Sequence, residues 1–204
     1  FMDYLVADET VIPESERAHY SERVIYMPAS YQVNDDRRQI ARTTPTRAEC
    51  WLPESGFVFC CFNNTFKITP NELDSWASLL TPVPASVLWL LGTNPQAEAN
   101  LAGLPVLTCP GRGFSARVAA SLLRAVDLEE TICASRDDYV QLALNLARDP
   151  ARLAALRQKL QQNTPTAPLF DTEGFTRALE DAFERVVSIH RLGKAATDLH
   201  LGGA

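Results

Sequence analysis

The sequence predicts an α/β fold in which helices flank a parallel, doubly wound sheet. Apolar runs of strand length alternate with amphipathic runs of helix length through most of the 204 residues. The run at 58–62 is apolar at every position, which is typical of a strand covered on both faces in a parallel sheet. A short polar loop and a helix start follow this run directly.

The first part of the chain supplies two short strands. Residues 3–8 and 24–27 are expected to be strands, the second stopped by Pro28, and residues 13–20 a polar turn of helix. Residues 32–54 are polar and include a Thr/Pro cluster, which indicates a linker or a long surface loop.

The helix after the apolar run at 58–62 has a clear start signal. Thr69 suits the N-cap, Pro70 the first helical position, and Glu72 stands where a capping box needs a glutamate. Apolar residues at helical spacing follow, so we expect a helix over 70–80. Lys67 then lies beyond the carboxyl end of a strand and just before a helix amino terminus. Open α/β sheets bind ligands at this edge, and anions gain there from the helix dipole and free backbone N–H groups, so a phosphate contact at Lys67 is predicted.

One crossover of the predicted sheet is unusually short. Strands are expected at 86–91 and 104–109, with residues 92–103 between them. A crossover between parallel strands needs ~10–12 residues including its helix, so this segment is the bare minimum. The sheet is therefore expected to be incomplete at this point.

The C-terminal half of the chain continues the alternation. The elements expected there, in order, are a helix capped by Ser115, a strand at 131–134, a helix over 137–147 capped by Ser135, and helices over 150–161 and 172–192. Residues 193–204 are expected to form a disordered tail.

The composition excludes several classes of protein. The net charge of −6 argues against broad nucleic-acid binding. No apolar run approaches the ~20 residues that span a bilayer, and no signal peptide is visible. The methionine in second position suggests that the sequence begins within a longer protein.

The cysteines and histidines predict neither disulfides nor a metal site. The cysteines are odd in number and form no C-x-x-C pair; they are Cys50, Cys60, Cys61, Cys109 and Cys133. Three of them sit in apolar strand candidates, which favours buried, reduced thiols in a cytosolic protein. The three histidines are widely separated, so no zinc site is predicted.

Several runs along the chain together match a known family. They are, in chain order, residues 1–4, 19–28, 62–70, 86–91, 103–111 and 116–121. This ordered series resembles the carboxyl-terminal catalytic region of protein O-linked N-acetylglucosamine transferases, a family that includes bacterial relatives and the plant Spindly-type fucosyltransferases. The resemblance covers nearly the whole chain, to about residue 187.

The resemblance implies the C-terminal part of a GT-B enzyme, with two Rossmann-like halves and usually with tetratricopeptide repeats upstream. Such enzymes transfer a sugar from a nucleotide donor, here most simply UDP-N-acetylglucosamine, to Ser or Thr hydroxyls of proteins, with inversion and without a metal or other cofactor. By this likeness, residues 1–35 are the end of the first, acceptor-side half and residues 36–49 a linker. Residues 50–192 are the second, nucleotide-sugar-binding half with its C-terminal helices, and 193–204 the tail.

Two site residues carry over from the family. A lysine in its F-N-x-x-x-K-I-x-P loop contacts the donor diphosphate and stabilises the leaving group, and Lys67 matches it. An amide residue three positions earlier also faces the donor, and Asn64 matches that position. The family's base lies outside the positions that match here, so no catalytic base is assigned.

The chain departs from the family between residues 91 and 104. The family places a long segment there, with the uridine-facing histidine, a phosphate-binding turn and the ribose-binding aspartate, and none of these is present. Three hypotheses therefore stay open. The chain is part of a UDP-N-acetylglucosamine-dependent transferase, part of a GDP-fucose-dependent Spindly-type enzyme, whose loop shares the second asparagine, or a non-catalytic module that binds a nucleotide weakly or serves as an interaction surface.

Overall fold

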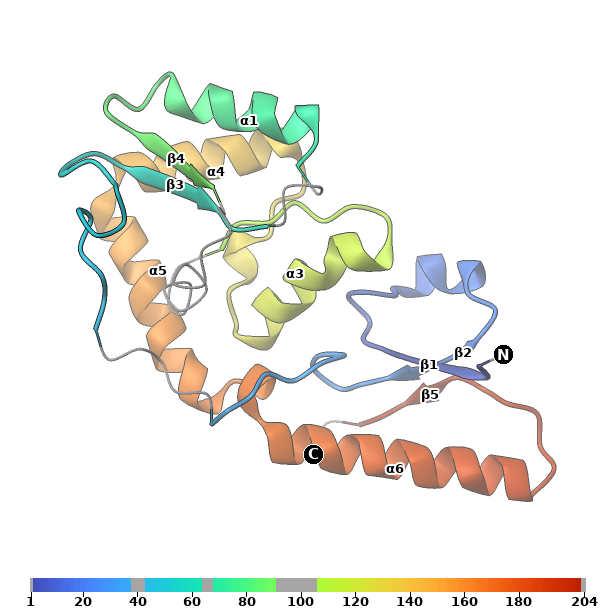
Figure 1. The fold of residues 1–204 in the computed structure, drawn as a ribbon. Coiled ribbons are helices and arrows are strands. Elements are labelled where there is room, and N and C mark those ends of the chain that lie inside the picture. The colour runs from blue at the N-terminus through green and yellow to red at the C-terminus, as the bar shows by residue number, and fades with distance from the viewer. Residues whose placement is uncertain (1, 38–42, 64–67, 91–105, 203–204) are drawn as a thin grey trace. The chain divides into compact units, whose positions relative to one another are not determined.

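The computed structural model describes residues 2–37, 43–63, 68–90 and 106–202 (Figure 1). The chain forms two compact units. The first unit comprises residues 1–37, 108–132 and 160–204, and the second comprises residues 38–107 and 133–159. This grouping differs from the boundaries predicted above, because residues 108–132 and the last helix pack with the first 37 residues. The assignment of these segments to the two halves of a GT-B enzyme stays a prediction.

The first unit is built on a parallel three-stranded sheet. Its strands, in the order in which they pair, are β1 (Tyr4–Ala7), β2 (Arg23–Tyr26) and β5 (Leu199–His200). β1 and β2 pair in register over all four residues of each strand. The strands predicted at 3–8 and 24–27 are confirmed, and the polar turn between them is the 3-10 helix Glu14–His19.

The predicted disordered tail is wrong for residues that the structure describes. Leu199 pairs with Ile25 of β2, and Leu201 is buried with its N–H donating to the Tyr26 carbonyl at 3.0 Å. The cause is the Asp198 carboxylate, which accepts hydrogen bonds from Arg17 at 2.6 and 2.7 Å. An ion pair between residues 181 positions apart has no local sequence signal.

Helices cover both faces of β2. Val24 and Tyr26 belong to a buried cluster with Ala7, against which Phe114 and Val118 of helix α3 (Phe114–Ala125) pack. The alternate residues Ile25 and Met27 pack instead with helix α6 (Thr172–Arg191). This alternation is the period of two that a strand imposes on its side chains.

Two local predictions in the first unit are wrong. Ser115 does not cap its helix, because α3 begins at Phe114 and Gly113 occupies the N-cap position. Residues 129–131 form a 3-10 helix in place of a strand, and Ile132 alone forms a parallel bridge, with Thr108. The predicted strand at 104–109 is described only from residue 106 onward.

The second unit packs helices on a parallel strand pair. β3 (Val58–Cys61) pairs with β4 (Val87–Leu90), as predicted for the runs at 58–62 and 86–91. Helix α1 (Pro70–Leu80) agrees with the predicted range, and α4 (Arg136–Arg148) extends the predicted helix by one residue at each end. Helix α5 (Pro150–Asn163) follows directly.

The core of the second unit lies on one side of its strands. The buried residues are Trp76 and Leu79 of α1, Val83, and Ala143 and Leu144 of α4. Phe59 and Cys61 of β3 pack against this cluster, while Cys60 between them is exposed. Among the described residues β3 is thus not covered on both faces, and the predictions of a doubly buried strand and of a buried Cys60 thiol are wrong. Cys133 is buried, and none of the five cysteines, all of which lie among the described residues, forms a disulfide.

None of the helices in the described part of the chain is both long and apolar enough to cross a membrane.

The Arg17–Asp198 ion pair makes the stability of the first unit depend on acid pH. The hydrogen bond from Arg17 lowers the pKa of Asp198, and the bond from the Val24 N–H at 2.9 Å lowers it further. A carboxyl whose folded pKa lies below its unfolded value of ~3.9 contributes fully above that value and loses the contribution as the pH falls through the folded pKa.

We therefore expect Asp198→Asn to lower the free energy of unfolding by about 2 kcal/mol at neutral pH. The difference from wild type should shrink below about pH 4, where the wild-type carboxyl takes up its proton. Urea denaturation at both pH values measures this. Asp181→Asn is the matched control, because Asp181 and its partner Arg185 are about half exposed and should contribute less than ~0.5 kcal/mol. Equal losses in the two variants would contradict the assignment.

Candidate functional site

The candidate site lies where β3 leads into α1. β3 and β4 are parallel, so the loops that follow their last residues, Cys61 and Leu90, leave from the same edge of the pair. Lys67 and Asn64 lie outside the described residues. The structure describes the elements on either side of these two residues in the sequence, namely the end of β3 and the first turn of α1.

The first turn of α1 is capped by its own glutamate. The Glu72 Oε2 atom accepts a hydrogen bond from the Thr69 N–H at 3.0 Å and a second from the Thr69 hydroxyl. The N–H groups of Glu72 and Leu73 both donate to the Thr69 carbonyl. These bonds confirm the predicted helix start at Thr69 and Pro70.

This capping changes the electrostatics expected of the site. A carboxylate already sits at the positive end of the helix dipole, and the N–H groups of Thr69, Glu72 and Leu73 are already donating. The hydrogen bond from Thr69 lowers the pKa of Glu72, and bonds from the Thr69 backbone and Arg136 act in the same direction, so Glu72 is charged at neutral pH. A phosphate at this junction therefore gains little from the helix itself and depends on side-chain donors in the loop.

Arg136 is the charged residue that sequence reasoning missed at this junction. It is the first residue of α4, and its Nη2 donates to the Glu72 Oε1 at 2.7 Å. The preceding residue, Ser135, caps α4 as predicted by accepting a hydrogen bond from the Asp138 N–H at 3.1 Å. The sequence did contain a signal for Arg136, namely its place beside a helix start. Arg136 directly follows the capping residue Ser135, and Lys67 likewise lies close to a capping residue, Thr69.

Aromatic residues pack in the core next to the end of β3. Trp76 of α1 and Tyr139 of α4 lie in one core with Cys61, the last residue of β3. Burial raises the pKa of Tyr139, although a hydrogen bond with Trp76 opposes the shift. Tyr139 is therefore a neutral phenol at physiological pH that packs against this core.

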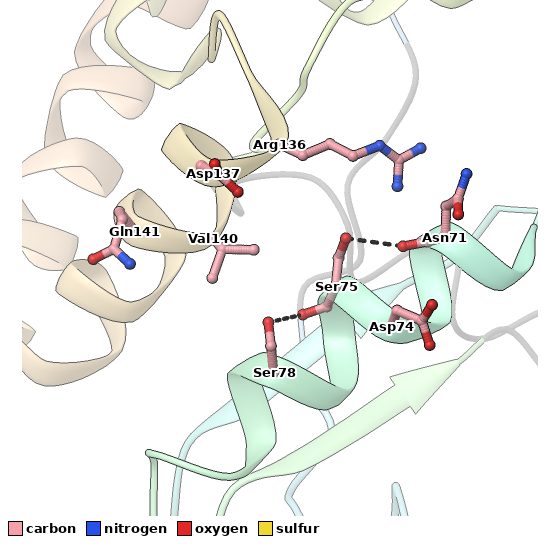
Figure 2. Close-up of a pocket in the computed structure, with 8 residues that line it drawn as sticks. All are labelled: Asn71, Asp74, Ser75, Ser78, Arg136, Asp137, Val140 and Gln141. Carbon is pink, nitrogen blue, oxygen red and sulfur yellow. Dashed lines mark hydrogen bonds between the residues drawn. The ribbon is translucent and has the colours of Figure 1, made fainter.

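A polar groove of about 690 Å³ lies between α1 and α4 (Figure 2). Its lining residues are Asn71, Asp74, Ser75 and Ser78 of α1 and Arg136, Asp137, Val140 and Gln141 of α4. The Ser75 and Ser78 hydroxyls donate to carbonyls of their own helix, as the dashed lines of Figure 2 show. Arg136 is held by Glu72, and Asp74 and Asp137 would repel an anion. The lining does not favour a nucleotide diphosphate in this groove.

A metal centre finds no support in the described residues. No group of three or more His, Cys, Asp or Glu side chains there is arranged to hold an ion. His19 is exposed beside Glu16, and His200 stacks on Tyr26 with ring centroids 4.5 Å apart.

Comparison with known proteins decides the family. The sequence profile of glycosyl transferase family 41 matches residues 39–102 and 94–179, which together make up more than half of the chain. The chain belongs to this family. It is 28% identical to the Arabidopsis thaliana protein SEC, named a probable UDP-N-acetylglucosamine–peptide N-acetylglucosaminyltransferase, over 95% of this chain and 26% of that protein.

Other members support the same placement. A UDP-N-acetylglucosamine–peptide N-acetylglucosaminyltransferase of Caenorhabditis elegans is 27% identical over 67% of this chain and 16% of that protein. The structure matches a lysine-to-methionine mutant of the O-GlcNAc transferase of Thermobaculum terrenum with a TM-score of 0.74 and 26% identity, over 90% of this chain and 45% of that one. The α/β fold class with parallel strands, predicted as part of a GT-B enzyme, is thereby confirmed. The chain spans about a quarter of the length of the Arabidopsis relative.

The alignments also bear on the short crossover. The alignment with the Arabidopsis protein runs over 252 positions, although this chain has 204 residues. The relative therefore carries residues that this chain lacks within the matched region. The family profile likewise matches in two parts that meet at residues 94–102, inside the segment where the sequence predicts an incomplete sheet.

The contribution of the Thr69 cap to the stability of the first turn of α1 can be measured. Thr69→Ala removes the hydroxyl that donates to Glu72, so we expect α1 to lose about 1 kcal/mol of stability, concentrated in its first turn. Amide hydrogen exchange of residues 71–74 measures this loss directly. Thr81→Ala at the other end of α1, where the hydroxyl donates to the Ala77 carbonyl, is the matched control and should leave these amides unchanged. Unaltered protection in Thr69→Ala would show that the loop end is held by something other than this cap.

Proposed function

We propose that the protein containing this chain transfers N-acetylglucosamine from UDP-N-acetylglucosamine to Ser or Thr hydroxyls of proteins. Membership of glycosyl transferase family 41 is the observation that carries the proposal. The relatives named for this activity match 67–95% of the chain. The strand–loop–helix junction at β3 and α1 supplies a site of the kind at which open α/β sheets bind ligands.

The chemistry is an inverting displacement that needs no metal. An acceptor hydroxyl oxygen attacks the anomeric carbon of the sugar, the bond from that carbon to the diphosphate breaks, and the hydroxyl proton passes to a base that no residue of this chain is assigned to supply. The departing nucleoside diphosphate gains negative charge as the bond breaks. A fixed cation that meets this charge stabilises the transition state more than the ground state.

Lys67 is the residue proposed to supply that cation, at the β-phosphate of the donor. The Glu72 carboxylate lies at the first turn of α1, so the helix end offers little to a phosphate. Asn64 is proposed to donate from its side-chain amide to the donor. In the absence of a metal, the leaving group depends on these two loop residues.

A second candidate donor is GDP-fucose. The loop of this chain reads Phe-Asn-Asn-Thr-Phe-Lys-Ile-Thr-Pro at 62–70, with the second asparagine that Spindly-type proteins share. Spindly proteins of Petunia hybrida and rice, both named probable UDP-N-acetylglucosamine–peptide N-acetylglucosaminyltransferases, are 26% identical over 89% and 91% of this chain. A donor-hydrolysis assay that compares the two nucleotide sugars separates the candidates.

A non-catalytic role is the third candidate, favoured by the residues that relatives carry and this chain lacks. Calorimetric titration with UDP and GDP tests it, because a structural remnant should release no heat at millimolar nucleotide. The remaining proposals are a cytoplasmic location, which reduced thiols favour, and tetratricopeptide repeats upstream.

The decisive variant is Lys67→Met in the intact protein. We expect turnover with UDP-N-acetylglucosamine to fall by about 100-fold or more, because the leaving-group charge loses its cation, and UDP to bind more weakly. Lys67→Arg should retain part of the activity, since it keeps the charge. Lys194→Met, at an exposed position of the first unit, is the control and should behave as wild type. Unchanged turnover and unchanged UDP affinity in Lys67→Met would remove the assignment.

A further inference from the structure

A buried carboxylate stands at the carboxyl end of β1. Asp8 follows Ala7 directly and is only 3% exposed. Its Oδ1 atom accepts hydrogen bonds from the N–H groups of Thr10 at 2.8 Å and Val11 at 3.0 Å. Its Oδ2 atom accepts from the Tyr31 N–H at 2.7 Å and from the Ser121 hydroxyl at 2.5 Å. One side chain thus ties together three segments that are distant in the sequence.

The network extends to a second buried hydroxyl. Ser121 is fully buried on α3, and Ser30, in the loop after β2, is 4% exposed. Their hydroxyl oxygens lie 3.5 Å apart, and the Ser30 hydroxyl also accepts from the Gln32 N–H at 3.4 Å. The loops that follow β1 and β2 are therefore both bonded to the same helix.

Apolar and charged contacts bring the same face of α3 to these loops. Phe114, Val118 and Ser121 are spaced by four and three residues, so they share one side of the helix. Phe114 meets the Tyr31 ring edge-on at 5.1 Å between centroids. From the next turns of the helix, Arg117 pairs with Glu16 at 3.5 Å and Arg124 donates to the Thr10 hydroxyl at 2.8 Å.

The polar network selects one arrangement of these contacts. Apolar side chains such as Phe114 and Val118 tolerate small sliding movements, because dispersion contacts are not directional. A buried carboxylate does not tolerate such sliding movements, because each hydrogen bond that is lost leaves an uncompensated charge or donor in the interior. Asp8 therefore fixes the position of the loop backbone at Thr10, Val11 and Tyr31 relative to α3.

We propose that Asp8 is a positioning residue that sets the acceptor side of the active site through Ser121 and Tyr31. The loops that it fixes leave the carboxyl end of parallel strands in the segment assigned to the acceptor-side half. The helix that it fixes them to begins directly after residues 110–113, in the segment assigned to the donor-binding half. This inference rests on the proposed function, and it adds that one buried carboxylate fixes the loops after β1 and β2 to α3 within the first unit.

The test separates acceptor from donor binding in the intact protein. In Asp8→Asn and in Ser121→Ala we expect the KM for an acceptor peptide to rise about tenfold, because loops near the acceptor lose their register. The affinity for UDP, measured by calorimetry, should stay within about twofold, since the donor loop at 62–70 is not part of the network. Asp3→Asn, an exposed carboxylate before β1, and Ser115→Ala, an exposed serine of α3, are the matched controls and should match wild type.

Hydrogen exchange distinguishes the possible failures. Faster exchange at the amides of Tyr31 and Val11 in Asp8→Asn is expected whether or not the protein transfers sugar. If the wild-type protein binds no UDP and transfers no sugar, the proposed function and the acceptor role are both contradicted. The hydrogen-exchange result would then show only that Asp8 fixes the loops. A wild-type acceptor KM in a folded Ser121→Ala protein that is active defeats the inference alone. An equal loss of UDP affinity and acceptor affinity defeats it too, because that is the result of general loosening. Should Asp8→Asn not fold, Ser121→Ala decides.

Discussion

The first unit depends on the burial of β2, which is covered on both faces and paired along both edges. Val24 and Tyr26 face the cluster that α3 covers, Ile25 faces α6, and β5 pairs along the edge opposite β1. α3 comes from residues 108–132, and α6 and β5 come from residues 160–204. A four-residue strand has too few backbone hydrogen bonds to be stable alone, so the burial of both its faces holds residues 1–37, 108–132 and 160–204 together.

The electrostatics of the second unit limit how a diphosphate would be bound. A helix amino terminus after a parallel strand is a general anion site when its N–H groups are free. In α1 the Glu72 carboxylate takes that place and is itself held by Arg136. The stability of the helix start and its use as an anion site are therefore in competition, and the capping box favours stability. The proposed role of Lys67 follows from this competition, since the cation replaces what the helix end does not provide.

The sequence predicted the elements whose signals are local. The helices at 70–80 and 137–147 were found because caps and apolar spacing lie within a few residues of one another. β5 was missed because two residues carry no strand pattern of their own, and the ion pair of the neighbouring Asp198 with Arg17 is distant in the sequence. The prediction that β3 is buried on both faces was wrong. An apolar run indicates that its side chains avoid water, but it does not indicate on which face of the strand other residues pack. The cap of α3 was misplaced by two residues because Gly113 is able to take the N-cap conformation without offering a side-chain bond.

The candidate site followed the same division between local and distant signals. The loop that carries Asn64 and Lys67 was predicted from neighbouring residues, and the structure confirms the strand before it and the helix after it. The contact between Arg136 and Glu72 joins residues 64 positions apart, and the contact between Ser121 and Asp8 joins residues 113 apart. In neither pair do the residues that neighbour one partner in the sequence indicate which distant residue it contacts.

These two contacts also narrow the search for a general base. Asp8, directly after β1, and Glu72, in the first turn of α1, are carboxylates that each accept several hydrogen bonds. Asp8 is buried and accepts four hydrogen bonds, so its oxygens are not available to a substrate hydroxyl. Glu72 spends both oxygens on Thr69 and Arg136, and its lowered pKa makes it a weak proton acceptor. A base of the strength that the proposed glycosyl transfer needs therefore has to come from residues other than these two.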